Sequence, residues 1–357
     1  MYIPFIIVLL GLLIICIIFK RAIFLKNIKR RNKKIIGFQV NGVGNGHIRQ
    51  AKTVYDILIK SYEIPVVLIY GENKSFNPLF NKSKVLYIKT LTNSESMNNM
   101  NIFHALIDIF KKKDTKTYEK KYFINTWVNF FVTDLFNFRT VQINIANQFI
   151  QNDLRIYFCI IICYMFSYTK IVSIHDKSIL SPHKIVTLVN LKKLDRSKID
   201  PKLVLCYSVS GTNFPNQLNL IAKKYPDYKF KYFTTSKLKV KLPNNVELFK
   251  PDKVQFNNYI KSCVLVLCTS GNELIQECVY NYIPVASMPC SKKQFEQMFN
   301  YKKYLSSNYI SSMYQINFDQ VINKKDLSVN DKFNLEVIDR DKKIYSILSE
   351  LINNPSH

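Results

Sequence analysis

Cysteine pairs at metal-binding spacing are missing from this chain of 357 residues. Its eight cysteines lie mostly inside apolar runs, and none forms a Cys-x-x-Cys pair, so the sequence suggests neither a zinc site nor a disulfide framework. Cysteines of this kind are typical of small buried side chains in a reducing compartment. Glycine is also scarce, at 8 residues, while aromatic residues reach 13%, which argues against a disordered chain because that much apolar surface can offset the entropy lost on folding. We therefore expect a folded protein with one large or two medium domains.

Acidic residues are few. The chain has 25 Asp and Glu against 51 Lys and Arg, a formal net charge of +26. So basic a surface suits anionic headgroups, phosphorylated substrates or nucleic acid. A general enrichment of the sequence in Lys, Asn and Ile accounts for the net charge equally well, so the net charge alone does not identify a binding partner.

The N-terminal segment, residues 1–19, carries no charge and has close to the roughly 20 residues that a membrane-spanning helix needs. A cleaved signal peptide would instead have a basic start, a shorter apolar stretch and a small-residue cleavage site. We therefore predict a single transmembrane anchor at 1–19, followed by a basic juxtamembrane segment at 20–34. The positive-inside rule then places the body in the cytoplasm, and the same basic residues can bind anionic lipid. A second apolar stretch, 156–168, is too short to span a bilayer and indicates either a buried element or a patch that dips into the membrane interface.

The body alternates strand and helix patterns, which indicates parallel sheets covered on both faces. We expect an N-terminal lobe at 35–195 and a C-terminal lobe at 196–357, with a last helix at 339–353 that returns across the lobes. The polar stretch 191–201 is the best linker candidate. Predicted strands are 35–40, 66–71, 85–91, 129–134, 140–148, 203–209, 228–235, 245–251, 264–269 and 283–289. Predicted helices are 48–62, 101–113, 216–225, 254–263 and 273–282. The fold class is thus two Rossmann-like, doubly wound α/β lobes, with a ligand expected at the carboxyl ends of the strands.

A glycine-rich turn precedes the first helix of the body. Glycines let another molecule approach the backbone closely, and a helix N-terminus offers unpaired amides. The spacing does not match the dinucleotide fingerprint, and no acidic residue ends the next strand, so an NAD site is a poor interpretation. His47 stands at the helix start, where the dipole favours a neutral imidazole that can accept a proton, although a packing role is equally possible from the residue alone. The turn residues are Gly42, Gly44, Asn45 and Gly46.

The most informative block runs from 268 to 300. Ser270 and Gly271 follow a strand, and the next helix places Glu273 and Glu277 at i and i+4 on one face. A carboxylate one turn into such a helix can accept hydrogen bonds from both hydroxyls of a ribose. Simple solvation of the two glutamates is the plainer alternative.

The order of this block resembles the signature of glycosyltransferase family 28 and MurG-like enzymes, which belong to the two-lobed GT-B type. The matching residues are Ser270-Gly271, Glu277, Pro284, Pro289, Glu296-Gln297 and Asn300. The N-terminal Gly-Asn-Gly-His-Ile-Arg segment also looks like the Gly-Gly-His turn of the same enzymes. The resemblance covers the body from about residue 34 to the C-terminus and leaves the anchor outside.

This resemblance implies a role for each matching residue. Glu277 is expected to bind the ribose, with Glu273 beside it, and Glu296 with Gln297 to contact the donor sugar. His47 is the candidate acceptor-side base. The diphosphate is expected on the amides of Ser270 and Gly271 and on the turn at Ser210, Gly211 and Thr212. Two departures stand out: this second turn has a single glycine where the MurG type has several, and Asn281-Tyr282 replaces a common Gly-Lys.

The resemblance implies a hexosyltransferase that moves a sugar from a UDP-sugar, such as UDP-GlcNAc, to a lipid-linked or other hydroxyl acceptor with inversion. Helix N-termini and loop amides can stabilise the leaving diphosphate, so we expect neither a metal nor a cofactor. Three alternatives remain open: a nucleotide-sugar 2-epimerase, a catalytically inactive scaffold that recruits a partner, and a membrane-tethered nucleic-acid binder. The last is the weakest because no nucleic-acid module is visible.

Overall fold

The computed structural model describes residues 36–41, 45–61, 66–70, 78–83, 85–88, 122–125, 141–147, 168–174, 183–208, 213–235, 238, 240–290, 295–324 and 326–353. The predicted anchor, the basic segment, the strand at 129–134 and the helix at 101–113 lie outside these residues. Of the apolar stretch 156–168, only Tyr168 is described. Within the described part of the chain, no helix combines the length and apolar character needed to cross a bilayer.

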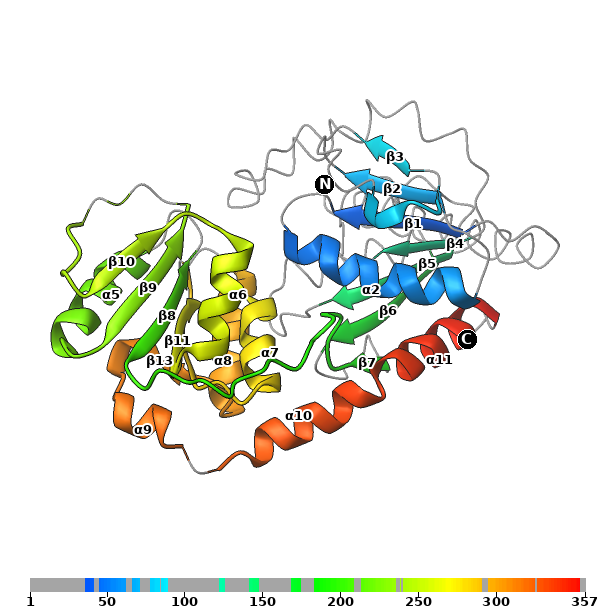
Figure 1. The fold of residues 1–357 in the computed structure, drawn as a ribbon. Coiled ribbons are helices and arrows are strands. Elements are labelled where there is room, and N and C mark those ends of the chain that lie inside the picture. Colours follow the sequence, from blue (N-terminus) through cyan, green and yellow to red (C-terminus); the bar gives the residue numbers. More distant parts are fainter. Residues whose placement is uncertain are drawn as a thin grey trace, which may run out of the picture. The chain divides into compact units, whose positions relative to one another are not determined.

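The chain divides into two compact α/β units. The first takes the described residues within Met1–Asn190 together with those within Asp339–His357, and the second takes Leu191–Ile338. Each contains its own parallel sheet (Figure 1). The predicted class of two doubly wound α/β lobes is therefore confirmed.

The sheet of the first unit has seven strands in the order β3-β2-β1-β4-β5-β6-β7. All neighbouring strands are parallel. The strands are β1 (Ile36–Asn41), β2 (Val66–Tyr70), β3 (Val85–Ile88), β4 (Tyr122–Asn125), β5 (Val141–Asn147), β6 (Tyr168–Ile174) and β7 (His183–Ile185). Four of them match predicted strands, whereas β4, β6 and β7 were not expected.

Helix α2 (Asn45–Ser61) buries an apolar stripe against the first sheet. Its Tyr55 packs edge-on against Phe80 at 5.0 Å between ring centroids and lies 6.2 Å from Phe38 of β1, and all three are nearly inaccessible to solvent. The Tyr55 hydroxyl donates to Ser83 Oγ at 3.0 Å, which satisfies the one polar atom of this cluster. Burial of these rings fixes the helix on the sheet.

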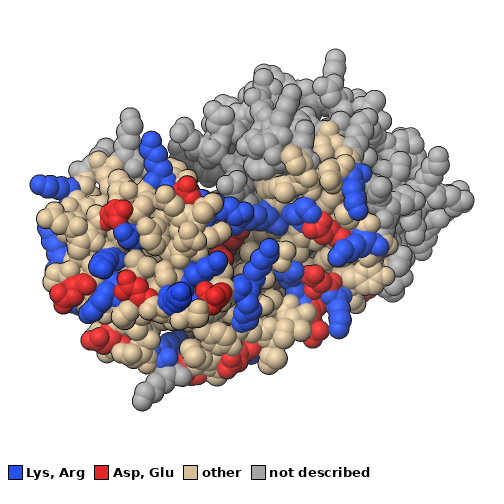
Figure 2. All heavy atoms as spheres, viewed as in Figure 1, with Lys and Arg blue, Asp and Glu red and all other residues tan. Residues whose placement is uncertain are grey.

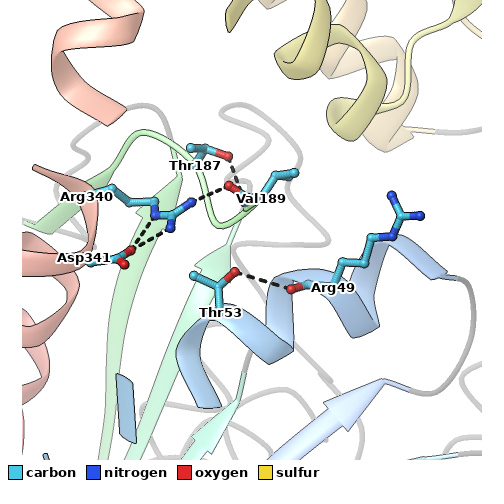
Figure 3. Close-up of polar contacts among 6 residues, drawn as sticks. All are labelled: Arg49, Thr53, Thr187, Val189, Arg340 and Asp341. Atoms are coloured by element: carbon cyan, nitrogen blue, oxygen red, sulfur yellow. Dashed lines mark hydrogen bonds and ion pairs between the residues drawn. The ribbon is translucent and has the colours of Figure 1, made fainter. Parts of the chain in front are cut away.

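The C-terminal helix α11 (Arg340–Asn353) also packs in the first unit, against α2 and β7. Its first residue, Arg340, is 8% exposed, and the guanidinium donates to the carbonyl oxygen of Val189 and pairs with Asp341 at 2.7 Å (Figure 3). The amide of Val189 donates to Thr187 Oγ1 at 2.9 Å. These contacts connect the segment that follows β7, at Thr187 and Val189, to the start of α11.

The second sheet has six strands in the order β10-β9-β8-β11-β12-β13, again all parallel. The strands are β8 (Leu203–Ser208), β9 (Lys229–Thr234), β10 (Val246–Phe249), β11 (Leu265–Thr269), β12 (Val285–Met288) and β13 (Ser311–Ser312). The first five match predicted strands to within two residues at each end, because each contains β-branched or aromatic residues between polar connections.

Helices cover both faces of the second sheet. Alternate residues of β8, Val204 and Cys206, face a core built with α5 (Phe214–Lys224) and the segment from 313 to 322. Tyr207 points to the other face and packs edge-on against Phe256 of α6 (Lys253–Ser262). The remaining helices are α7 (Asn272–Tyr280), α8 (Phe295–Ser306), the short 3-10 helix η4 (Met313–Gln315), α9 (Phe318–Ile322) and α10 (Ser328–Ile338).

Candidate functional site

Buried hydroxyl groups line the carboxyl edge of the second sheet. Ser208, the last residue of β8, lies 2.6 Å from the hydroxyl of Tyr232 and 3.5 Å from Thr234 Oγ1. At the neighbouring strands β11 and β12, Ser270 Oγ lies 2.8 Å from Ser287 Oγ. Burial raises the pKa of Tyr232, so its hydroxyl stays a neutral hydrogen-bonding group. In parallel sheets this edge is where ligands bind.

Backbone hydrogen bonds hold the turn from β11 into α7. The amide of Ser270 donates to the carbonyl oxygen of Met288 at 3.0 Å, and the amide of Gly271 donates to that of Thr269 at 2.7 Å. Both amides that the sequence assigned to a diphosphate are therefore already engaged. The Asn300 side chain donates to the Ser270 carbonyl oxygen at 3.1 Å and fixes the same turn from α8.

The first turn of α7 supplies the alternative donors. Gly271 is its N-cap and has no side chain, so the N-cap position supplies no capping hydrogen bond. A Cβ added at Gly271 would meet none of the described residues within 4 Å, so the described part of the turn borders open space. Uncapped first-turn amides beside open space form a suitable cradle for an anion, and here they begin at Asn272.

The rotation of α7 about its axis is set by a buried polar network. Tyr304 of α8 donates to Asn272 Oδ1 at 2.5 Å and accepts from Gln276 Nε2 at 3.2 Å. With this face buried, Glu273 and Glu277 lie one turn apart on a half-buried face. The spacing expected from the sequence is thus present, and neither glutamate is fully exposed to solvent.

Helix α8 carries the second half of the sequence signature. Gln297 accepts from the amide of Cys290 at 3.1 Å and lies 2.7 Å from its Sγ, so its Oε1 is held by the chain that leaves β12. This leaves Nε2 of Gln297 as the atom suited to a sugar hydroxyl. Glu296 is the second residue of α8, and its side chain lies outside the described part.

The C-terminal end of α7 carries Asn281 and Tyr282, the pair that departs from the Gly-Lys of the resemblance. Tyr282 has φ of 55°, and the bonds from Tyr282 to Val279 at 3.3 Å and from Ile283 to Cys278 at 2.9 Å form a Schellman motif, whose left-handed residue is usually glycine. The Tyr282 hydroxyl donates to Asp331 at 2.6 Å. This contact helps to stabilise a tyrosine in a left-handed backbone conformation that glycine adopts at a lower free-energy cost.

Asn281 ties the same helix end to the start of the second unit. Its side chain donates to the carbonyl oxygens of Lys192 at 3.1 Å and Glu277 at 3.0 Å, and accepts from the amide of Leu194 at 2.8 Å. The predicted linker at 191–201 is therefore fastened to α7 rather than free. Asn281 and Tyr304 are structural supports of the site that the sequence patterns did not reveal, because both act through contacts distant in the chain.

The residues that the sequence predicts for the acceptor side belong to the first unit. Helix α2 begins at Asn45, three residues before the predicted start, so Asn45, Gly46 and His47 form its first three residues rather than a loop. The His47 side chain and the glycines at Gly42 and Gly44 lie outside the described residues, as does the turn at Ser210, Gly211 and Thr212.

Among the described residues, no group of three or more His, Cys, Asp or Glu is placed to hold a metal ion. The five described cysteines, at positions 206, 263, 268, 278 and 290, are buried free thiols. On the face drawn in Figure 2, basic side chains are intermixed with acidic ones. Among the described residues of this face, the positive charge therefore does not gather into one patch.

No protein-family model and no curated protein matches the sequence. Solved structures do match the fold. MurG from Acinetobacter baumannii is 12% identical with a TM-score of 0.53, over 89% of this chain and 100% of that one. The spinosyn forosaminyltransferase SpnP is 10% identical with a TM-score of 0.58, over 90% and 100%. UDP-N-acetylglucosamine 2-epimerase from Rickettsia bellii is 12% identical with a TM-score of 0.53, over 90% and 98%. The chain therefore has the two-lobed GT-B fold that glycosyltransferases of the MurG type share.

Proposed function

We propose that the protein is a membrane-anchored glycosyltransferase that moves a sugar from a UDP-sugar, UDP-GlcNAc or a close analogue, to a hydroxyl acceptor. The carrying observation is the uncapped start of α7 at the carboxyl edge of the second sheet, with Glu277 half-buried one turn further on. First-turn amides suit a diphosphate, and a carboxylate at that distance suits the two hydroxyls of a ribose. The fold shared with MurG and SpnP supports this assignment.

The reaction is an inverting displacement. The acceptor oxygen forms a bond to the anomeric carbon while the bond from that carbon to the diphosphate oxygen breaks, and UDP leaves with the bonding electrons. Amides at the start of α7 stabilise the charge that gathers on the diphosphate, without a metal. His47 takes the acceptor proton, which contributes about 10² to 10⁴ in rate. Nε2 of Gln297 donates to a hydroxyl of the donor sugar.

The acceptor is lipid-linked in this proposal. An uncharged segment at 1–19 followed by basic residues at 20–34 would hold the body at the cytoplasmic face of a membrane, beside anionic headgroups. A glycan acceptor carried on a lipid would then diffuse in the same plane as the enzyme.

A second candidate function is nucleotide-sugar 2-epimerisation. The observation in its favour is the fold shared with the epimerase from Rickettsia bellii at a TM-score of 0.53. An epimerase needs no acceptor and gains nothing from an anchor. The two functions therefore differ in whether UDP-GlcNAc alone is converted to its epimer.

The test uses the full chain in detergent micelles. Binding at about 100-fold over Kd should raise the free energy of unfolding by roughly 2.7 kcal/mol, which a thermal shift detects. Glu277→Gln should weaken UDP-GlcNAc binding at least about tenfold, the effect of losing a charge-assisted hydrogen bond. Glu336→Gln removes the same charge from α10 and should leave binding unchanged.

Product analysis then separates the candidates. Release of UDP that depends on a lipid-linked acceptor supports transfer, whereas an epimer formed from UDP-GlcNAc alone supports epimerisation. If no UDP- or GDP-sugar shifts the unfolding temperature, the enzyme assignment fails. Cellular function that survives Glu277→Ala would point to an inactive scaffold instead.

A further inference from the structure

Helix α7 carries a carboxylate where its proposed ligand carries phosphate. Glu273 is the second residue of the helix and the acidic residue of its first turn, and it is half-buried. Helical side chains lean toward the N-terminus, so a carboxylate at the second position of a helix is carried toward the first-turn amides. Glu277, proposed to hold the ribose, lies one turn further from the helix start.

The start of a helix stabilises one negatively charged group, but a second negative group at the same place is repelled by the first. In the free protein the Glu273 carboxylate is favoured there, because it complements the partial positive charge of the helix end. A diphosphate bound to the same amides places like charge beside it. Each additional negative charge on the ligand therefore increases its repulsion from the Glu273 carboxylate.

The turn that precedes α7 cannot readily relieve this repulsion by moving. Asn300 is 1% exposed and holds the Ser270 carbonyl oxygen at 3.1 Å, and the Ser270 hydroxyl pairs with Ser287 at 2.8 Å. The Oδ1 atom of Asn300 is buried and has no hydrogen-bond partner among the described residues. Because this acceptor is buried, an ordered water inside the turn rather than a ligand at its surface would satisfy it.

We propose that Glu273 determines the charge specificity of the site: it disfavours free nucleoside diphosphate and triphosphate relative to the nucleotide-sugar. This inference rests on the proposed function and deepens it. The terminal phosphate of a free nucleotide loses a second proton near pH 6. In the nucleotide-sugar this phosphate is esterified to the sugar, so it carries one negative charge fewer. The donor therefore meets less repulsion than UDP, and release of UDP after transfer is favoured.

The experiment compares UDP-GlcNAc, UDP and UTP as ligands of the full chain by titration calorimetry at low salt. Glu273→Gln should tighten UDP by about three- to tenfold and UTP by more, while UDP-GlcNAc changes less. Raising the salt concentration should shrink the differences. The free Glu273→Gln protein should melt slightly lower than the wild type, because the helix end loses its complementary charge.

Glu336→Gln serves as the matched control, since it removes one carboxylate from α10 of the same unit and should alter all three ligands equally or not at all. An equal effect of Glu273→Gln on the three ligands, or a weakening of UDP, overturns the proposed role of Glu273 while leaving the nucleotide site intact. A wild-type protein that binds none of the three overturns both this inference and the proposed function.

Discussion

Replacing Gly271 with alanine should separate folding from nucleotide binding. The residue has φ of −76° and ψ of 136°, which alanine adopts without strain, and the added Cβ meets nothing within 4 Å. Removing glycine restricts the unfolded chain and stabilises by about 0.4–1 kcal/mol. Alanine is a poorer N-cap than glycine, which costs a comparable fraction of a kcal/mol. The two effects offset, so the free energy of unfolding should change by no more than about 0.5 kcal/mol.

Binding should respond differently. In the proposed site the diphosphate approaches through the open space beside Gly271, so a methyl group there would hold the phosphate oxygens away from the first-turn amides of α7. We expect UDP-GlcNAc affinity to fall at least about tenfold, or about 1.4 kcal/mol. The assay is calorimetric titration, with chemical denaturation of the same sample to measure stability.

Asn317→Ala provides the opposite control. Asn317 caps α9 by accepting from the amide of Gln320 at 3.3 Å, and α9 packs beside Tyr225 at the far end of α5. Its loss should lower the free energy of unfolding by about 1 kcal/mol and leave affinity unchanged. The reasoning is refuted if Gly271→Ala binds UDP-GlcNAc as the wild type does, or if it unfolds much more easily.

Two further predictions concern the interior of the second unit. Asn300→Asp should lower the free energy of unfolding by about 3 kcal/mol and more than Asn300→Leu, because aspartate leaves a charge unpaired beside the Ser270 carbonyl oxygen; equal losses in denaturant titrations would contradict this. Burial raises the pKa of the Cys263 and Cys268 thiols to about 12. Unfolded thiols ionise near pH 8.5, so the stability present below that pH should fall by about 1.4 kcal/mol per thiol for each unit between pH 9 and 12. Cys263→Ala should flatten this decline in denaturant titrations, and an unchanged slope would exclude the assignment.

The first five strands of the second sheet were predictable from their composition. Each of the first five has enough β-branched or aromatic residues to stand out against polar connections. The two-residue strand β13 has no such run and is defined only by its pairing with β12. Helix α10 buries Phe333 as its one described core residue, so it lacks the apolar stripe from which helices are recognised.

The site was predictable in its elements but not in its hydrogen bonds. A strand, a Ser-Gly turn and two glutamates four residues apart are local patterns, and the structure contains them. Which amides remain for a ligand depends on where the carbonyl oxygens of Met288 and Thr269 lie. The network of Tyr304 with Asn272 joins residues 32 positions apart, and no local pattern encodes such a contact.

Because α11 belongs to the first unit but follows the whole second unit in sequence, the two units cannot mature in the order in which they are translated. On the ribosome, Leu191–Ile338 is a continuous stretch that can complete its own core as soon as it emerges. The surfaces of α2 and β7 must wait, uncovered, until Arg340 and the turns beyond it leave the exit tunnel. The first unit to be synthesised is thus the last to be finished, which makes it the part of the nascent chain most exposed to chaperones.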